Sequence, residues 1–231
     1  MQIIDSTVLG VRSAVWHLRL DDQSPQFFLF PMIHIADENF YKEVVERLEN
    51  CDLIFCEGVK SKTASLITLS YRQLVRNPKL GFVEQRSMSL GHLKECIVHA
   101  DVGSAEFEKK WQTLPPLYRF FIPLAAPIYG LYLRFFGSRQ LIAKHLALDL
   151  HKSRYELLTD DEPDELQDLI IDWRDKHLIQ VIERELSKRD NQQISIGVVY
   201  GAAHMRAVLK HLIHKRSYRA VGSEWLTVFY I

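Results

Sequence analysis

The sequence lacks several features that would assign a protein to a class at once. Its three cysteines, Cys51, Cys56 and Cys96, show no CxxC spacing, which argues against a disulfide framework or a zinc finger and favours a reducing compartment. The first residues, Met-Gln-Ile-Ile-Asp, include no basic segment followed by an apolar one, so no signal peptide is visible. We therefore expect a cytoplasmic protein.

An excess of charge is also missing. The chain holds 29 Lys and Arg against 29 Asp and Glu, so no global field attracts nucleic acid or an anionic membrane, and we expect no nucleic-acid partner. The apolar share of 47% and the length of 231 residues are ordinary for a globular protein that buries its core without disulfides. We expect one domain over residues 1–231.

Several common catalytic motifs are absent as well. The sequence contains no Gly-x-Ser-x-Gly elbow, Walker loop, Gly-x-Gly-x-x-Gly fingerprint or His-Glu-x-x-His helix. Cys56 adjoins Glu57, but a buried structural thiol is a simpler interpretation than a nucleophile. His211 and His214 lie three residues apart on a predicted helix, where a solvated surface is the simpler interpretation.

No apolar run is long enough to span a bilayer, although residues 115–137 are rich in aromatic side chains and proline. The run between Arg119 and Arg134 is 14 residues, below the roughly 20 that a membrane-spanning helix needs. Pro123 and Pro127 would also interrupt a helix. We predict a buried or lid-like helical segment. The flanking Arg and Tyr residues leave peripheral membrane contact or partner contact as the alternative.

Strand and helix signals alternate in the first third of the chain. Residues 13–20 and 26–33 are rich in strand formers and flank a polar turn, which predicts a hairpin. Asp37 is placed to cap a helix, and residues 53–56 form a short apolar strand after it. This strand–helix–strand unit predicts parallel pairing with a right-handed crossover.

The remaining patterns complete an α/β prediction. Residues 61–160 are expected to form a mostly helical insertion, and Pro163 suits the first position of a long amphipathic helix through about residue 188. Residues 194–200 predict a buried strand, followed by a helix with Met205 and Leu212 on its inner face. Two antiparallel strands are expected at the end, at 218–221 and 225–231. The economical arrangement is a mixed β-sheet with helices on its faces.

Three polar residues each follow an apolar strand-like run: His34, Glu57 and His204. Ligands of open α/β sheets bind beyond the carboxyl ends of the strands, so these side chains would share one crevice if their strands are neighbours. Two imidazoles and a carboxylate also form a known ligand set for catalytic zinc, which acidifies its bound water. A single histidine is more often structural. Glu57 is more informative, since a buried carboxylate is costly unless paired or coordinated.

The same residues carry a resemblance to a known family. Pro31-Met32-Ile33-His34, Leu53-Ile54-Phe55-Cys56-Glu57 and Gly201-Ala202-Ala203-His204 resemble, in this order, the TraB/PrgY/GumN family. That family includes the Tiki metalloproteases and is distantly related to erythromycin esterase and ChaN-like proteins. Its pattern is two Gly-x-x-His motifs, a glutamate after an early strand, and an arginine-containing helix before the second motif. Arg174 and Asp175 match that helix, Asp101 is a further candidate, and Pro31 replaces the first glycine.

The resemblance implies a hydrolase that depends on a divalent metal ion (manganese, cobalt or zinc) and acts on a small molecule or a peptide. His34, Glu57 and His204 would hold the metal, with Glu57 as ligand or general base and the histidines as ligands or proton carriers. Arg174 would stabilise developing charge. Two alternatives stay open. One is a non-catalytic module that binds a peptide, haem or a small ligand, and the other is a membrane-associated regulator that docks through residues 115–137.

Overall fold

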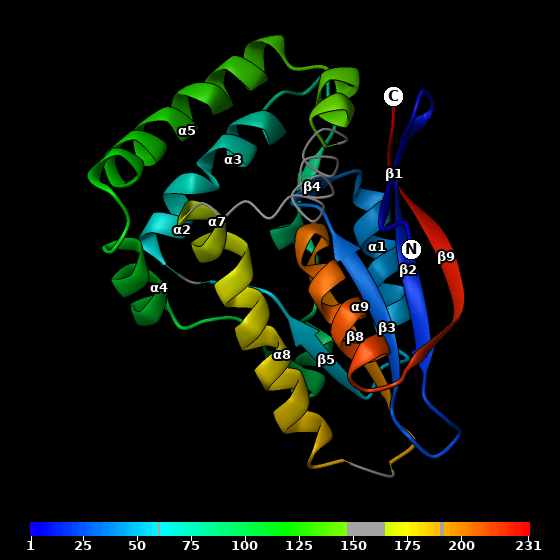
Figure 1. Cartoon of the computed structure of the whole chain (residues 1–231). Helices are drawn as coiled ribbons and strands as arrows, with labels where there is room; N and C mark the ends of the chain where they lie inside the picture. Colours follow the sequence, from blue (N-terminus) through cyan, green and yellow to red (C-terminus); the bar gives the residue numbers. More distant parts are fainter. Residues whose placement is uncertain (60, 147–164, 190–191) are drawn as a thin grey trace.

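A seven-stranded mixed sheet organises the chain, of which the computed structural model describes residues 1–59, 61–146, 165–189 and 192–231 (Figure 1). The α/β class is therefore confirmed. The sheet order is β1 (Ile4–Thr7), β2 (Gly10–Arg19), β3 (Gln26–Met32), β8 (Ser195–Gly201), β5 (Leu53–Cys56) and β7 (Ile97–His99), and β9 (Arg219–Tyr230) pairs with β2.

The four strands β3, β8, β5 and β7 run parallel, and β8 lies between β3 and β5. The expected direct pairing of β3 with β5 is therefore wrong, although both strands and the helix between them, α1 (Glu38–Leu48), form as predicted. Residues 196–200 of β8 are all buried, as expected for a central strand that is covered on both faces. Asp37 precedes α1 without a side-chain cap hydrogen bond, and its carboxylate pairs instead with Arg139 at 2.6 Å.

The other half of the sheet is antiparallel. β1 pairs with β2 and β2 with β3, so the predicted hairpin forms. The two strands expected at the end of the chain are one continuous strand, β9, which pairs with β2 along its length. Two register shifts on β2, between Val11 and Arg12 and between His17 and Leu18, absorb the twist of this long pairing. Gly222, which lies between the two predicted strands, is therefore part of β9.

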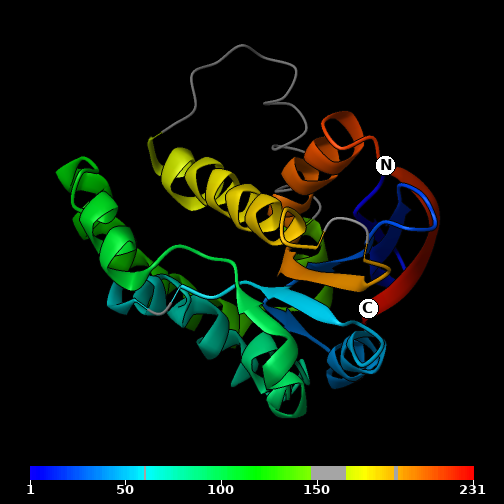
Figure 2. The ribbon, with the colours of Figure 1, turned by 90° about the horizontal axis from the view of Figure 1, so that it is seen from below.

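Helices cover both faces of the sheet, with α8 (Trp173–Leu186) and α9 (Met205–His214) on one face and α1 on the other (Figure 2). Each buries an apolar stripe, which for α9 includes Met205 and Leu212 as predicted. The expected long helix before β8 is present as α7 (Glu165–Gln167), a π-helical turn (Asp168–Asp172) and α8. Pro163 lies outside the described residues.

Four helices form an arm beside the sheet (Figure 1): α2 (Lys62–Ile67), α3 (Leu69–Val75), α4 (Ser104–Trp111) and α5 (Pro116–Phe136). The helical prediction for residues 61–160 holds for these segments, and residues 147–160 lie outside the described ones. The range is not a purely helical insertion, however, because β7 joins the main sheet from inside it. Short 3-10 turns (Gln85–Ser87 and Gly91–Cys96) and a small β4–β6 sheet (Ile35–Ala36 with Val83–Glu84) link it to the core.

α5 departs most from its prediction. It is continuous through Pro123 and Pro127, and most of its surface is exposed, with Gly130 and Leu133 as its buried residues. An exposed helix tolerates proline because water can solvate the carbonyls that the missing N–H groups leave free. The segment is helical as predicted, but the expectation that it is buried is wrong; a lid-like role stays a prediction. Among the described helices, none has the length and apolar character to cross a bilayer.

Candidate functional site

The polar residues predicted from the sequence gather at one edge of the sheet. Glu57 directly follows β5, Asp101 follows β7 by two residues, and His204 ends a 3-10 turn (Ala202–His204) after β8. Since these strands are parallel neighbours, their carboxyl ends meet at the same edge, which is where open α/β sheets bind ligands. Three segments distant in sequence thus contribute to one site.

Arg174, at the start of α8, joins two of these carboxylates. Its Nη2 atom donates to Glu57 Oε1 at 2.6 Å and to Asp101 Oδ2 at 2.6 Å, and its Nε donates to Asp101 Oδ1 at 3.0 Å. The side chain is only 10% exposed. Burial lowers the pKa of Arg174, but the hydrogen bond to Asp101 and the charge of Glu57 raise it further, so the guanidinium stays charged. One buried cation therefore holds two buried anions.

Glu57 is held at both carboxylate oxygens. Oε1 accepts from Arg174, and Oε2 accepts from the backbone N–H of Gly201 at 2.6 Å. A Cβ at position 201 would lie 3.1 Å from Oε2 and 3.3 Å from His204 Cδ2, so glycine permits this close approach. Burial raises the pKa of Glu57, but the charges of Arg174, His204 and His34 together bring it below its usual value. Glu57 is therefore ionised at neutral pH.

Asp101 is fixed as firmly. Besides its two bonds to Arg174, Oδ1 accepts from the N–H of Val102 at 2.8 Å and Oδ2 from the N–H of Gly58 at 3.0 Å. Burial raises the pKa of Asp101, while Arg174 and the two backbone donors lower it by more. These contacts place Asp101 in the same network as Glu57, as the sequence predicted.

Asp175 and His204 form a second pair beside the first. His204 Nδ1 lies 2.7 Å from Asp175 Oδ1, and His204 Nε2 lies 3.9 Å from Glu57 Oε1. An ionised carboxylate only accepts hydrogen bonds, so Nδ1 carries the proton donated to Asp175, and Nε2 is the ring nitrogen that faces Glu57. Burial raises the pKa of Asp175, and the hydrogen bond and charge of His204 partly oppose it. The π-helical turn before α8 is a feature often found at functional sites, and here it precedes the Arg174–Asp175 pair.

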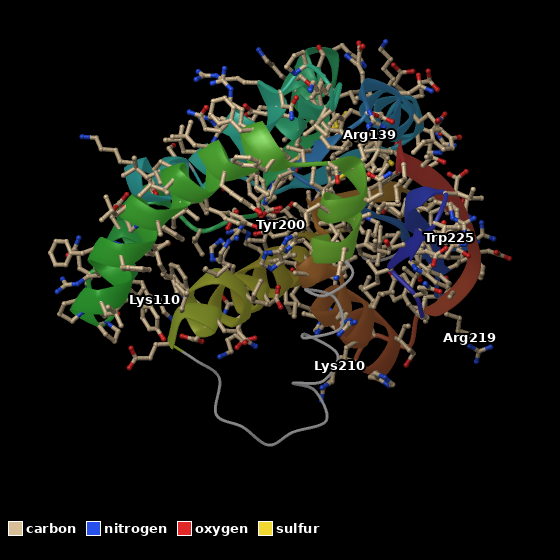
Figure 3. All side chains as sticks on the ribbon, turned by 90° about the horizontal axis from the view of Figure 1, so that it is seen from above. Lys110, Arg139, Tyr200, Lys210, Arg219 and Trp225 are labelled. Carbon is tan, nitrogen blue, oxygen red and sulfur yellow. The ribbon has the colours of Figure 1, made fainter. Side chains whose placement is uncertain are left out.

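Tyr200 belongs to this cluster and was missed from the sequence, where it reads only as the last residue of a buried strand. Its ring meets the His204 ring edge-on at 4.9 Å between centroids, and Arg174 Cζ lies 5.6 Å from the ring centroid. Figure 3 shows Tyr200 near the centre of the molecule, whereas Lys210 and Arg219 lie near its edge. The Tyr200 hydroxyl is buried and has no hydrogen bond of standard geometry in the described part of the chain. Burial raises the pKa of Tyr200, and Asp101 raises it further through its charge and a hydrogen bond. A buried tyrosine hydroxyl normally has a partner.

His34 is not part of the hydrogen-bonded network. Its side chain is exposed and packs against Tyr71, with 5.1 Å between ring centroids. The chain turns after β3 into β4, which pairs with β6, and the His34 carbonyl accepts from Gln85 N–H at 2.9 Å. This turn carries the imidazole out to the surface. Its charge still contributes to the lowered pKa of Glu57, so it lies within electrostatic range.

The described residues do not form a ligand set for a metal ion. No group of three or more His, Cys, Asp or Glu side chains among them is arranged to hold one. Both oxygens of Glu57 already accept strong hydrogen bonds, and His34 stands apart. The metal trio of His34, Glu57 and His204 therefore stays a prediction, and no step below depends on a metal.

Comparisons with family models, curated proteins and solved structures found no match. The resemblance to the TraB/PrgY/GumN family thus stays a prediction. The function proposed below rests on the positions of the side chains at the site. That geometry joins Glu57, Asp101, Arg174, Asp175 and His204 into one connected cluster. Burying ionised groups costs free energy even when they are paired, and such clusters concentrate at binding and catalytic sites.

Cys56 and His211, which were also considered from the sequence, have structural roles. Cys56 is buried, and burial raises the pKa of its thiol to about 12, so it is a protonated structural thiol rather than a nucleophile. His211 Nε2 lies 2.7 Å from Glu183 Oε1 on the outer side of α8 and α9, away from the site. The structural thiol is thus confirmed for Cys56. The solvated surface predicted for His211 is wrong, because its side chain is 18% exposed and paired with Glu183, and it holds for the exposed His214.

Proposed function

We propose that the chain is a hydrolase that uses acid–base chemistry at the edge formed by β8, β5 and β7. The observation that carries the proposal is the position of His204 between two carboxylates, with Nδ1 2.7 Å from Asp175 and Nε2 3.9 Å from Glu57. Carboxylate–histidine pairs of this kind set the tautomer and orientation of a catalytic imidazole. The predicted family resemblance points in the same direction.

His204 is the proposed proton carrier. Its Nε2 accepts a proton from a water molecule, whose oxygen bonds to the electrophilic carbon of an ester or amide. The same proton then passes to the leaving group as the carbon–heteroatom bond breaks, so the imidazole returns to its starting state. Asp175 stabilises the imidazolium between these two steps, and the nearby charge of Glu57 does the same from the other side.

Arg174 and Tyr200 have different parts in the proposal. Arg174 is engaged by Glu57 and Asp101, so it keeps those carboxylates in place rather than binding substrate, and we regard it as a positioning residue. The Tyr200 hydroxyl has Asp101 beside it as an acceptor, and it would leave this acceptor for a substrate. It would donate to the substrate oxygen that becomes negative in the transition state.

The small exposed fractions of the proposed catalytic side chains limit which substrates can reach them. The side chains of His204 and Glu57 are 4% and 10% exposed, so only a small reacting group reaches them. A small-molecule ester or amide, or an extended peptide, fits this requirement. Metal dependence on manganese, cobalt or zinc stays a separate prediction, tested by elemental analysis and titration with each ion.

Activity assays with single variants test the proposal. A panel of small esters and short peptides is screened with the wild-type protein, with His204→Gln, and with His211→Gln as the matched control on α9. We expect His204→Gln to lose on the order of 100-fold or more in kcat/KM, the usual contribution of a general base, and His211→Gln to keep wild-type activity. Equal loss in both variants, or none in either, contradicts the proposal.

Tyr200→Phe separates catalysis from folding. The Tyr200 hydroxyl has no hydrogen bond of standard geometry in the described part of the chain, and Asp101 is close enough to raise its pKa, so its removal should change the unfolding temperature little. If Tyr200 donates to the substrate, kcat falls about tenfold or more while the fold is retained. Unchanged kcat removes Tyr200 from the mechanism, and a lower unfolding temperature gives the hydroxyl a structural partner.

A second function is a binding module that does not catalyse. The separation of His34 from the cluster and the engagement of both Glu57 oxygens favour it, because a fully paired network is a rigid platform rather than a reactive one. In this case a ligand found by screening binds equally well to wild type and to His204→Gln. Loss of turnover with retained binding supports the hydrolase instead.

A further inference from the structure

The exposed side of α5 is the largest unexplained apolar surface among the described residues. Ten large apolar side chains on this helix are between 43% and 74% exposed: Leu117, Phe120, Phe121, Leu124, Ile128, Tyr129, Leu131, Tyr132, Phe135 and Phe136. A fully exposed aromatic side chain presents about 150–250 Å², so together they expose an area on the order of 1,000 Å². The largest apolar patch on a typical monomer is about 300–600 Å², and larger ones mark interaction sites.

The patch covers the helix from end to end without a charged residue in its centre. At 100° per residue, Leu117, Phe121, Leu124, Ile128 and Phe135 fall on one side of the helix. The opposite side holds Gly130 and Leu133, which are buried. A Cβ at Gly130 would lie 2.6 Å from Ser70 Cα, so α3 packs closely on that side, while no described residue buries the other side.

The charge of the arm selects a partner. Residues 61–83 and 109–146 contain ten Lys or Arg and no Asp or Glu, and three of the ten, Arg72, Lys110 and Arg139, pair with carboxylates outside these ranges. The balanced chain is therefore locally basic around α2, α3 and α5, while α4 carries Glu106 and Glu108. Five of the ten basic residues, Lys62, Arg76, Lys79, Lys109 and Lys144, are exposed. An anionic surface complements this region, whereas a second copy of the arm would bring like charges together.

The two arginines of α5 have a suitable arrangement for such a surface. Arg119 Cζ lies 6.0 Å from the Phe120 ring centroid and Arg134 Cζ lies 5.8 Å from the Phe135 ring centroid, so each cation accompanies an exposed aromatic ring near one end of the helix. Arginine and tyrosine beside an apolar helix face are the groups that interfacial helices place at the level of lipid headgroups. At 1.5 Å per residue, the 21 residues of α5 form a platform roughly 30 Å long.

We propose that α5 lies flat on an anionic lipid surface and attaches the protein peripherally through its aromatic side. The apolar side chains enter the headgroup–acyl boundary, and the basic residues of the arm contact the anionic headgroups. Two attractions then act together, burial of apolar area and charge, as stable peripheral binding requires. The proposal does not depend on the chemistry at Glu57 and His204.

Vesicle flotation tests the proposal with the full chain. Vesicles of phosphatidylcholine alone are compared with equimolar phosphatidylcholine and phosphatidylserine, for wild type and for the triple variant Phe121→Gln, Leu124→Gln, Phe135→Gln. The matched control is Val8→Gln, Leu9→Gln, which removes apolar side chains that are 89% and 74% exposed on the β1–β2 turn. Circular dichroism establishes that each variant is folded.

We expect wild type and control to bind anionic vesicles at least tenfold more tightly than neutral ones, with binding weakened by salt. The triple variant should lose at least tenfold in affinity. Absence of binding to either vesicle overturns the proposal, and so does a triple variant that binds like wild type. Self-association in sedimentation that the triple variant abolishes, without lipid binding, assigns the patch to a second copy instead.

Discussion

The site at the sheet edge and the outer side of α5 break the ordinary burial rule in opposite ways. At the edge, Arg174, Asp175 and His204 are charged or polar and yet buried, while on α5 the rings of Phe120 and Phe135 are apolar and yet 74% and 71% exposed. Hydrogen bonds between its members hold the first arrangement together. The phenylalanine rings of the second have no polar atoms with which to form hydrogen bonds. Burying a charge and exposing an apolar surface to water both cost free energy, so each arrangement indicates a role other than stabilising the fold.

Removal of Arg174 should give the largest effect. Arg174→Met leaves Glu57 and Asp101 buried without their cation, which typically costs about 3–5 kcal/mol of unfolding free energy. Lys176→Met, two residues along the same helix and exposed, should change stability by less than about 0.5 kcal/mol. Urea unfolding measures both. Equal small effects would mean that the network is not buried as described.

A methyl group at Gly201 should have an intermediate effect. Gly201→Ala places a Cβ 3.1 Å from Glu57 Oε2, so the carboxylate must move, at a cost of about 1–3 kcal/mol. Gly222→Ala is the matched control because nothing lies within 4 Å of its Cβ. Thermal unfolding compares the two variants. If Gly201→Ala is as stable as Gly222→Ala, the close approach of Glu57 to the backbone is not tight.

Acid should weaken the site before it affects α5. Glu57 and Asp101 have folded pKa values below their ordinary ones, so their stabilising contribution is full above the unfolded pKa of about 4 and is lost as pH falls through the folded pKa. Asp175, with a raised pKa, has the opposite sign. Unfolding free energy measured from pH 7 downward should therefore fall less steeply in Glu57→Gln than in wild type. If the unfolding free energies of the two proteins fall with equal slope, the pKa of Glu57 is not lowered.

The smallest effect is expected on α5 itself. Phe135 is 71% exposed, so Phe135→Gln should change the unfolding free energy by less than about 0.5 kcal/mol. Leu133 on the buried side of the same helix is 8% exposed, and Leu133→Ala should cost about 2–5 kcal/mol. Unfolding experiments without lipid compare them. A large loss in Phe135→Gln would show that the aromatic side is packed in the protein.

The sequence predicted the strands and the residues at their ends better than their neighbours. Apolar runs ending in Glu57 and His204 located two strand ends, and the rule that parallel strands share an edge placed them together. The insertion of β8 between β3 and β5 could not be predicted, since pairing depends on hydrogen bonds between segments about 140 to 170 residues apart. β7 was missed because three residues are too few for a periodic signal.

Two site features lay beyond the sequence for different physical reasons. His34 follows an apolar strand as Glu57 does, but the β4–β6 pairing turns its side chain outward, and local residues do not encode that pairing. Tyr200 looks like a core residue because its strand is apolar, and only the positions of Arg174 and His204 reveal its polar surroundings. For α5, the sequence predicted a helical segment, but neither its continuity through Pro123 and Pro127 nor which side of it the rest of the chain would cover.

The protonation of His204 is the central claim, and nitrogen NMR of the imidazole groups tests it without a substrate. The protein has 10 histidines, and the His204 signal is assigned by its loss in His204→Gln. We predict a proton on Nδ1, donated to Asp175, and an unprotonated Nε2 facing Glu57, with this preference lost in Asp175→Asn. A neutral ring protonated on Nε2 would contradict the account, because the atom proposed to accept a proton would already carry one.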